Sequence, residues 1–455
     1  MKRIRRLMIA NRGEIAVRVI RSCRELGIET VLAASEADLD SVAARLADRT
    51  VCIGPAPPAR SYLDIDAVVG AAVRAQVDAI HPGYGFLSEN ATFAGRCGAA
   101  GLIYVGPDVE QLRAAGDKLE ARRHAATAGL PVAPGGAVAT LAEAEALGRK
   151  IGVPLLVKAV GGGGGRGMKL VRRAGDLSDT LHLAMSEAQA AFGDARVYLE
   201  RFIASGRHVE VQIVGDGERV IHLGDRDCSV QRRYQKLVEE APAPALPDEL
   251  RAAMHAGAVA FGRQLRYRGL GTVEFLVDAE RGEFYFLEMN ARIQVEHPVT
   301  EMITGLDLVA EQLAIAEGRP LRLRQEDVAF RGSALECRVN AEDARQDFRP
   351  SPGTITTAVL PAGVGVRVDT HIEAGTRVPP FYDSLLAKII TCGTDRAHAC
   401  STMLTALANC RIEGVANNLA LLAEIVADPA FARGGVDTTW LAHWLTRAET
   451  HASNS

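Results

Sequence analysis

Short hydrophobic runs alternate with longer amphipathic stretches in the first hundred residues of the chain. The pattern predicts strands at 7–10, 30–34 and 79–80 and helices at 15–26 and 68–75. Such alternation is typical of a parallel sheet covered by helices. Ligands bind beyond the carboxyl ends of the strands in such sheets, and residues 11–14 and 81–85 occupy these ends. Ordinary turns remain the alternative for these two loops.

A second unit begins near Pro131 and is centred on a glycine run, residues 161–167. The surrounding pattern predicts strands at 154–159 and 168–171 and helices at 117–129, 141–151 and 177–191. A P-loop needs Gly-Lys followed by Ser or Thr, and a dinucleotide fingerprint opens a helix, whereas Gly167 is followed by Met168 and a strand. The run predicts a hairpin whose backbone N–H groups fold over phosphate oxygens, with a flexible linker as the alternative.

The chain becomes richer in strands from about residue 205. The pattern predicts strands at 209–214, 219–223, 271–277, 283–290 and 334–340, and helices at 249–266 and 306–317. Residues 379–383 predict a turn before a short strand, and the tail from 396 to 446 is helical. These elements indicate a mixed α/β fold.

Polar residues occupy every second position from Glu288 to Glu296. In an extended segment they would share one face, which then carries Glu288, Asn290, Arg292, Gln294 and Glu296. A solvated edge strand is the alternative. The preceding predicted strand also places Glu274 among strand-forming residues, and an isolated carboxylate in apolar surroundings is costly unless it is paired or bound to a metal. We therefore expect Glu274 and Glu288 to be cation ligands.

Bulk composition narrows the class of protein. The 455 residues suffice for about three domains, and a net charge of −4 provides no general basic field for nucleic acid. Eight cysteines without a Cys-x-x-Cys pair are typical of reduced thiols in a cytosolic chain. The apolar run after the basic start is too short for a signal peptide, and no later segment is long enough to span a membrane. We expect a cytoplasmic protein.

Two carboxylates, a glycine lid and isolated lysines are suited to phosphoryl transfer from a nucleotide. Mg²⁺ prefers one or two carboxylates together with phosphate oxygens, and Asn290 could help to hold a second ion. Lys118 and Lys158 would offset the charge that spreads over the transferred group. A surface position is the alternative for Lys118, whereas Lys158 closes an apolar strand.

Taken together, the motifs resemble the biotin carboxylase branch of the ATP-grasp enzymes. The matching segments follow in order from Asn11 to about Asn418 and include 117–118, 158–167, 200, 207–210, 224–242, 288–301 and 336–343. The last segment, Glu-Cys-Arg-Val-Asn-Ala-Glu-Asp, discriminates most, because generic ATP-grasp ligases lack it. The resemblance implies an ATP-grasp fold with a Rossmann-like N-terminal domain (1–115), a glycine-rich lid subdomain (116–204), a catalytic core (205–330) and a mixed α/β C-terminal domain (331–446).

The resemblance also implies ATP-dependent carboxylation of biotin by bicarbonate through a carboxyphosphate intermediate. It assigns ATP binding to Lys118, Lys158, Gly164, Gly165, Glu200, Arg201, Phe202, Ile203, His208, Gln231, Glu274 and Glu288. Residues 200–203 would read the adenine edge through backbone groups. Mg²⁺ or Mn²⁺, in two sites, would be held by Glu274, Glu288 and Asn290. For His208, a satisfied place in the core remains the alternative.

By the same resemblance, bicarbonate would be held by Lys236, Arg292, Gln294, the backbone of Val295, and Glu296. Glu296 would be the general base, and Lys236 and Arg292 complete the catalytic set with Arg338. In this family the released phosphate is thought to deprotonate biotin, Arg338 would stabilise charge on the ureido oxygen, and Tyr84 would contact biotin. The residues alone leave a surface or salt-bridged arginine open for Arg338 and an exposed or helix-capping acid for Glu296.

Two positions depart from the family pattern. Tyr234 replaces a histidine, and Val364 stands where relatives often carry an aromatic residue at the dimer contact, although Arg18, Glu25 and Arg367 match interface positions. We expect a homodimer. Because the helical tail ends without a biotinyl-lysine domain, we also expect a separate biotin carboxyl carrier protein and carboxyltransferase subunits, which would select acetyl-CoA or another acceptor.

Two other functions remain open on the sequence. The first is another ATP-grasp ligase that forms an acyl phosphate for an amine acceptor, against which the Arg338 motif argues. The second is a nucleotide-binding regulatory subunit that is catalytically silent, against which the intact charged residues argue.

Overall fold

The N-terminal region is a five-stranded parallel sheet with helices around it. The computed structural model describes residues 3–160 and 168–452. Its strand order is β3-β2-β1-β4-β5, with β1 Arg6–Ile9, β2 Glu29–Ala34, β3 Arg49–Cys52, β4 Ala79–His81 and β5 Ile103–Tyr104. The helices are α1 Gly13–Glu25, α2 Val42–Leu46, α3 Ile65–Arg74 and α4 Ala91–Ala99. The predicted alternation of strands and helices is confirmed.

Two helices, α5 Val109–Gly116 and α6 Lys118–Thr127, lead into a smaller unit. Its four-stranded sheet has the order β6-β9-β7-β8, with β6 Gly135–Val138, β7 Leu155–Ala159, β8 Met168–Val171 and β9 Val197–Arg201. Helices α7 Leu141–Ile151 and α8 Leu177–Phe192 pack on it. Strands β7 and β8 are antiparallel, with Lys158 opposite Met168. The predicted strands on both sides of the glycine run therefore pair, while Gly164 and Gly165 lie outside the described residues.

An eight-stranded antiparallel sheet forms the centre of the molecule. Its order is β14-β13-β10-β11-β12-β15-β22-β20, with β10 Gly206–Asp216, β11 Val220–Arg232, β12 Gln235–Ala241, β13 Arg268–Asp278, β14 Glu283–Asn290, β15 Ser333–Asn340, β20 Val366–Thr370 and β22 Leu385–Gly393. Helices α9 Asp248–Gln264, α10 His297–Thr304 and α11 Leu308–Ala316 accompany it. Because β12 pairs with β15, one sheet continues from the predicted catalytic core into the predicted C-terminal domain.

Small strands and helices complete the C-terminal region. The strands are β16 Glu342–Asp343, β17 Arg349–Pro350, β18 Gly353–Thr354, β19 Thr357–Val359, β21 Arg377–Val378 and β23 Arg411–Glu413. The helices are α12 Arg396–Ala408, α13 Leu419–Ala427, α14 Pro429–Arg433 and α15 Trp440–Ala452. Short 3-10 segments lie at Glu36–Asp38, Pro58–Arg60, Ala174–Asp176 and Gln325–Asp327.

Two strand predictions were wrong in extent. The strand expected at 219–223 continues to Arg232 as β11, and β12 follows it. The hydrophobic pattern fails there because β11 buries charged residues, including Arg226, whose guanidinium is satisfied by Glu210 and neighbouring polar side chains. The strand after residue 383, expected to be short, is the nine-residue β22.

The polar face expected from Glu288 to Glu296 is also not a single strand. Strand β14 ends at Asn290, and α10 begins at His297 with a proline in its first turn. The chain leaves the sheet because the N–H of Ala291 donates to the Glu89 carboxylate at 2.9 Å. Residues 291–296 therefore form a connecting loop.

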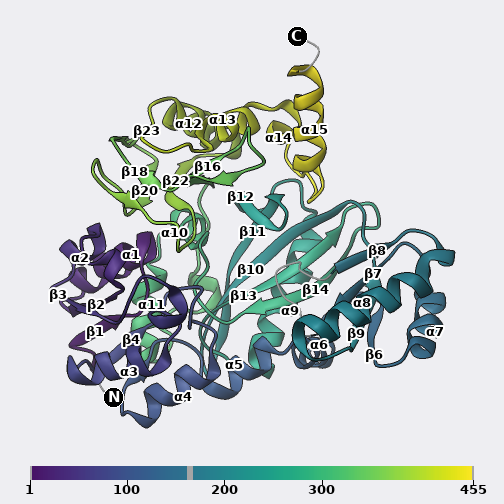
Figure 1. Cartoon of the computed structure of the whole chain (residues 1–455), viewed down its shortest axis with the longest axis horizontal. Helices are drawn as coiled ribbons and strands as arrows, with labels where there is room; N and C mark the ends of the chain where they lie inside the picture. Colours follow the sequence, from purple (N-terminus) through teal and green to yellow (C-terminus); the bar gives the residue numbers. More distant parts are fainter. Residues whose placement is uncertain (1–2, 161–167, 453–455) are drawn as a thin grey trace.

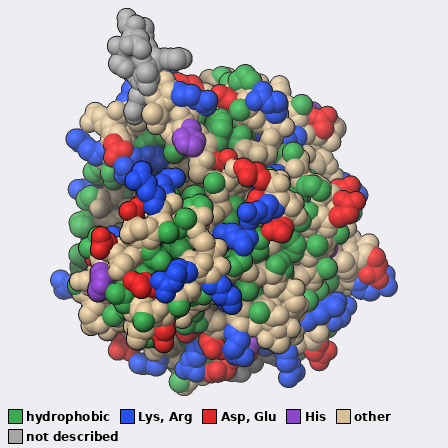
Figure 2. Space-filling model, turned by 90° about the vertical axis from the view of Figure 1, so that its right-hand side faces the viewer, with side chains coloured by type: hydrophobic (Ala, Val, Ile, Leu, Met, Phe, Trp, Pro, Cys, Tyr) green, Lys and Arg blue, Asp and Glu red, His purple; other side chains and the backbone are tan. Residues whose placement is uncertain are grey.

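Figure 1 shows the parallel sheet and the smaller α7–α8 unit on opposite sides of the central sheet, with the C-terminal elements above. The face in Figure 2 carries interspersed positive and negative side chains, as expected for a net charge of −4. Within residues 3–160 and 168–452, no helix is long and apolar enough to cross a membrane.

Candidate active site

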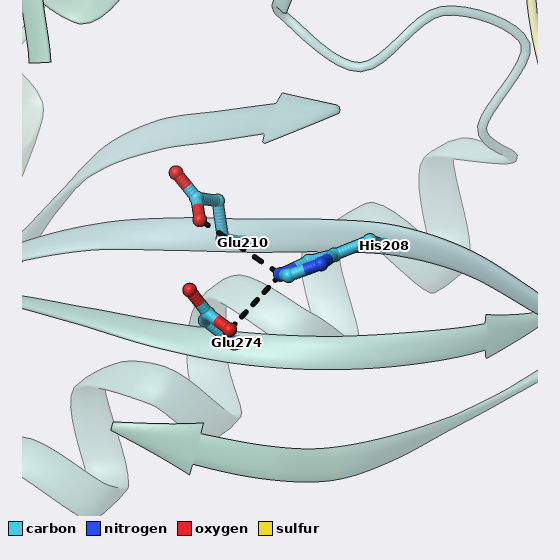
Figure 3. Close-up of side chains that lie close together, drawn as sticks. All are labelled: His208, Glu210 and Glu274. Carbon is cyan, nitrogen blue, oxygen red and sulfur yellow. Dashed lines mark ion pairs between the residues drawn. The ribbon is translucent and has the colours of Figure 1, made fainter. Parts of the chain in front are cut away.

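The central strands β10 and β13 bring three ionisable side chains together. Glu210 lies opposite Glu274 in the antiparallel register, and His208 lies two residues from Glu210 on the same face. The His208 Nε2 atom is 3.0 Å from a Glu274 oxygen and 4.0 Å from a Glu210 oxygen. Figure 3 shows the three side chains pointing toward one another. Burial would lower the pKa of His208, but the Glu274 carboxylate raises it overall.

Lys236 of β12 reaches into the same group of carboxylates. Its Nζ atom lies 2.7 Å from Glu210, 3.2 Å from Glu274 and 2.6 Å from Glu296. Burial alone would lower the pKa of Lys236, yet these carboxylates and Cys228 raise it well above its usual value. Lys236 is therefore a fixed cation that bridges the two carboxylates of the central sheet and the one at the start of α10.

The two carboxylates predicted as cation ligands are direct neighbours. Glu288 of β14 lies opposite Glu274, and the Asn290 side chain donates to Glu274 at 2.9 Å. Burial and the Glu274 charge raise the pKa of Glu288, although Lys118 acts in the opposite direction. Each of the three side chains has an oxygen atom that can bind a metal ion, and a cation would offset the repulsion between the two carboxylates. The set therefore fits a divalent cation such as Mg²⁺.

Two further side-chain groups have ligand atoms close enough for a metal ion. One is His208 with Glu210 and Glu274, and the other is Glu210 with Cys228 and Glu296. The ammonium group of Lys236 already contacts Glu210 and Glu296 of the second group. Glu274 belongs to the first group and lies opposite Glu288, so the predicted cation ligands border that group.

Arg292 is held in the loop after β14. Its guanidinium donates to Glu89 at 2.8 Å, to Asn290 at 2.7 Å and to the Gln294 side chain. Gln294 in turn donates to Glu274 at 3.2 Å. The loop therefore carries its polar side chains toward Glu274, and Glu89 of the N-terminal region fixes both the backbone and the arginine of the loop.

Glu296 is buried at the first position before α10, and its side chain makes no capping hydrogen bond. Besides Lys236, it accepts a hydrogen bond from Arg338 at 3.0 Å. Burial alone would raise the pKa of Glu296, but Lys236, Arg338 and Arg226 hold it well below its usual value. The exposed and helix-capping alternatives for Glu296 are both wrong, and the group is a charged internal carboxylate.

Arg338 projects from β15 beside Glu296. Its Nε atom donates to Glu239 of β12 at 2.5 Å, and its side chain is only 16% exposed. A surface position is therefore excluded, whereas Arg338 is salt-bridged, to Glu239 and Glu296. With Lys236, Arg338 provides two cations on either side of one carboxylate.

Tyr84 comes from the loop after β4, on the N-terminal sheet. The side chain of Asn11, at the end of β1, donates to the Pro82 and Tyr84 carbonyls at 2.7 Å each. A Cβ atom at Gly83 would lie 2.8 Å from the Asn11 side chain, so the close approach of the two predicted loops requires glycine there. The Tyr84 hydroxyl donates to Glu14, and burial and Glu14 raise the pKa of Tyr84 while Arg338 opposes the shift.

The nucleotide-binding candidates are spread over several elements, with Lys118 on α6, Lys158 on β7 and others on or next to β9, β10 and β11. Lys158 forms an ion pair with Glu200, which lies opposite Leu156 across β7 and β9. The N–H groups of Arg201 and Phe202 already donate to the carbonyls of Pro134 and Pro154. An adenine contact in this segment would therefore use the carbonyl groups or Ile203. Gln231 is buried on β11, directly opposite Lys236.

The sequence predicted no individual role for several residues that lie near the predicted site residues: Glu89, Glu210, Glu239, Glu336 and Lys388. Lys388 is fully buried on β22, donates to the Val295 carbonyl at 2.7 Å and lies 3.2 Å from Glu14. Its position within an apolar strand was a usable signal, like that of Lys158. Glu89 carried no such signal, because its partner Arg292 is distant in the chain.

The two departures from the family pattern lie at the surface. Tyr234 is 62% exposed, and Val364 is fully exposed. Arg18 is instead buried and pairs with Glu301 at 2.8 Å, and Arg367 pairs with the same carboxylate at 2.7 Å.

Comparisons with known families cover most of the chain. Residues 3–112 match the biotin carboxylase N-terminal domain, residues 117–324 the ATP-binding domain of the carbamoyl-phosphate synthase L chain, and residues 336–443 the biotin carboxylase C-terminal domain. The chain is 50% identical over 443 residues to biotin carboxylase of Pseudomonas aeruginosa, with 96% of this chain and 98% of the relative covered. It is 47% identical over 441 residues to biotin carboxylase 1 of Bacillus subtilis, with coverages of 96% and 98%.

Solved structures give the same result. The biotin carboxylase–ATP complex of Campylobacter jejuni superposes with a TM-score of 0.93 at 43% identity, covering 97% of this chain and 99% of that one. The biotin carboxylase domain dimer of Hydrogenobacter thermophilus 2-oxoglutarate carboxylase, with MgADP and bicarbonate, has a TM-score of 0.92 at 42% identity. It covers 97% of this chain and 98% of that domain.

Proposed function

The chain belongs to the biotin carboxylase family, and from that premise we propose how its residues divide the reaction. The protein is an ATP-dependent ligase that carboxylates biotin with bicarbonate and uses Mg²⁺. One observation carries the assignment of the site. The neighbouring carboxylates Glu274 and Glu288, the proposed cation ligands, join through Lys236 to a third carboxylate, Glu296, which in turn contacts Arg338.

The phosphate donor lies on the β14 side of this arrangement. Glu274, Glu288 and Asn290 would hold Mg²⁺ or Mn²⁺, in two sites, and a bound ion would supply positive charge to offset that of the phosphate groups. Lys118 and Lys158 contact phosphate oxygens, and the nucleotide site also takes in Gly164 and Gly165, which lie outside the described residues. Residues 200–203, His208 and Gln231 complete the nucleotide site.

Bicarbonate lies between Lys236 and Arg292, with Gln294 and the Val295 backbone beside it. Glu296 takes the hydroxyl proton of bicarbonate onto a carboxylate oxygen. While Lys236 and Arg338 both contact Glu296, they hold its pKa well below the usual value, and the carboxylate is too weak a base to take this proton. Anionic bicarbonate draws Lys236 away from Glu296, which raises the basicity of that carboxylate. The freed oxygen attacks the γ-phosphate, and ADP leaves.

Carboxyphosphate then breaks into CO₂ and phosphate, and the phosphate takes the N–H proton of the biotin ureido group. Arg338 donates hydrogen bonds to the ureido oxygen as negative charge develops on it, and Tyr84 borders the same space. The ureido nitrogen attacks CO₂ to form the new carbon–nitrogen bond.

Biotin arrives on a separate carrier protein, and a carboxyltransferase passes the carboxyl group to acetyl-CoA or another acceptor. This proposal is supported by the alignments with two relatives named biotin carboxylase, which cover 98% of each relative. The solved dimer of a relative supports a homodimer, in which Arg18, Glu25 and Arg367 contribute. Eight free cysteines suit the reducing cytoplasm.

ATP hydrolysis with bicarbonate, measured with and without free biotin, tests the function. We expect biotin to stimulate hydrolysis and carboxybiotin to form. ATP binding without any stimulation would contradict the proposal and favour a silent regulatory subunit, and hydrolysis stimulated by an amine would favour another ATP-grasp ligase.

Arg338→Ala tests the biotin step separately. We expect much of the bicarbonate-dependent ATP cleavage to remain while biotin carboxylation is lost. Equal loss of both activities would contradict the role of Arg338 on the ureido oxygen.

A further inference from the structure

Arg338 lies between two carboxylates on opposite sides. Its Nη2 atom is 3.0 Å from Glu296, and its Nε and Nη2 atoms are each 2.5 Å from the same oxygen of Glu239. Glu239 is on β12, the strand next to β15. Its carboxylate is completely buried, so its contact with Arg338 is shielded from water and strong.

A second carboxyl group lies beside the first. Glu336 is directly opposite Glu239 in the β12–β15 register and is also completely buried. Both oxygens of Glu336 lack a hydrogen-bond partner, and so does Oε2 of Glu239, the oxygen that does not contact Arg338. Such orphaned oxygens are costly unless they meet each other through a proton. Burial raises the pKa of Glu239 to about 7 and that of Glu336 well above its usual value, so the pair retains a proton at neutral pH.

We propose that Glu239 and Glu336 are positioning residues that together hold Arg338 in place for the ureido oxygen of biotin. The proposal rests on the proposed function, in which Glu296 accepts a proton from bicarbonate. At that moment Glu296 loses its negative charge and its hold on Arg338 weakens. Glu239 keeps the Nε edge of the guanidinium, so the remaining N–H groups stay directed toward biotin.

Glu336 fixes the orientation of the Glu239 side chain. As the protonated partner, Glu336 donates its O–H to Oε2 of Glu239. Oε1 of Glu239 then remains the acceptor for Arg338. Two ionised carboxylates against one guanidinium would instead repel each other in the interior. The shared proton therefore holds the Glu239 side chain in one orientation.

The chain provides a matched control in the next residue. Glu240 lies on the opposite face of β12 and is also buried, and its pKa is likewise raised to about 7 by burial. It accepts hydrogen bonds from Arg396 at 2.5 and 3.2 Å, and Arg396 lies outside the site described above. Glu240→Gln and Glu239→Gln therefore remove the same charge from the same strand, one residue apart.

The test compares steady-state kinetics of the full chain and these two variants. For Glu239→Gln we expect the KM for free biotin to rise about tenfold or more, as expected for loss of a charge-assisted hydrogen bond. The KM for ATP and the biotin-independent hydrolysis rate should stay within about twofold of the parent protein. Glu336→Gln should raise the KM for biotin less, and Glu240→Gln should leave it unchanged.

Two results would overturn the proposal. One is a KM for biotin in Glu239→Gln that equals that of Glu240→Gln, and the other is a parallel loss of biotin-independent ATP hydrolysis. Thermal unfolding checks that each variant folds. If Glu239→Gln does not fold, Glu239→Asp replaces it in the test. The carboxylate of aspartate is one methylene shorter, so we expect the KM for biotin to rise. An unchanged KM for biotin would contradict the proposal. Failure of the parent protein to respond to biotin is measured separately and bears on the proposed function alone.

Discussion

At the scale of single residues, this protein places charges where water cannot reach them. Lys236 contacts three carboxylates, and Arg226 is fully buried with polar partners on every side. An isolated buried charge would be strongly destabilising, but each of these has its counter-charge within hydrogen-bond distance. The same arrangement that satisfies the charges also collects the groups needed for phosphoryl transfer.

Glu288 provides a direct test of the cation site. Glu288→Gln keeps the shape of the side chain but removes the charge opposite Glu274. We expect the Mg²⁺ concentration for half-maximal ATP hydrolysis to rise about tenfold or more, because one carboxylate ligand is lost. Titration of activity with Mg²⁺ checks this, and an unchanged Mg²⁺ dependence would count against Glu288 as a ligand.

His81 predicts a pH dependence of stability. It is buried, its Nδ1 accepts from the Gly83 N–H at 3.0 Å, and burial lowers its pKa to about 4. Because the unfolded chain has the ordinary pKa of about 6.5, the unfolded state takes up a proton first. The contribution of neutral His81 is thus full above pH 6.5 and is lost as the pH falls toward 4, by about 3 kcal/mol.

The measurement is the free energy of unfolding by denaturant between pH 7 and 4.5. His81→Asn should lose less stability over this interval than the parent protein. Both proteins contain the other histidines, so their contribution cancels in the comparison. Equal slopes for the two proteins would mean that His81 does not remain neutral.

At the scale of elements, β22 shows how one strand acts on a distant loop. Lys388 lies opposite Arg338 in the β15–β22 register and donates to the Val295 carbonyl, while its charge is balanced by Glu14. The connecting loop 291–296 is therefore held by Lys388 of the C-terminal part of the sheet and by Glu89 of the N-terminal region. Neither tie is local in sequence.

Lys388→Met tests this tie. Methionine fills similar volume without the ammonium group, so the Val295 carbonyl loses its donor. We expect the KM for bicarbonate to rise about tenfold, while the KM for ATP changes little. Lys169→Met, on the partly exposed β8, is the matched control and should leave the KM for bicarbonate unchanged. A larger effect on ATP than on bicarbonate would contradict the positioning role.

At the scale of the whole molecule, the N-terminal and C-terminal regions meet around Tyr382. Its hydroxyl is hydrogen-bonded to Ser35 at 2.6 Å and donates to the Ala56 carbonyl, and the guanidinium of Arg12 lies 4.2 Å from its ring centroid. These contacts fix the segment that carries Tyr382 against the parallel sheet.

Tyr382→Phe removes the hydroxyl and keeps the ring. We expect the free energy of unfolding to fall by about 1 kcal/mol, since Ser35 loses a partner that water replaces poorly. Phe381→Leu, at a side chain 47% exposed, should change the stability less. Thermal and denaturant unfolding measure both, and an equal effect would show that the hydroxyl adds nothing to the contact.

The sequence by itself determined the regular elements and the chemical parts. Periodicity located α7, β8 and β14 to the residue, because their hydrophobic patterns are local and uninterrupted. Motif order along the chain indicated the family, and residue type predicted Glu274 and Glu288 as cation ligands, a role that the Mg²⁺ titration of Glu288→Gln tests. The regular elements depend on neighbours within a few positions.

Only the tertiary structure decided how the parts meet. The length of β11, the loop after Asn290 and the partners of Arg338 depend on contacts between residues far apart in the chain, such as Glu89 with Arg292 and Glu239 with Arg338. From the sequence alone, a buried charged residue is predicted to lie at the surface, because the residue that balances its charge belongs to another strand. Pairing of charges across strands, rather than any local pattern, therefore gives this site its geometry.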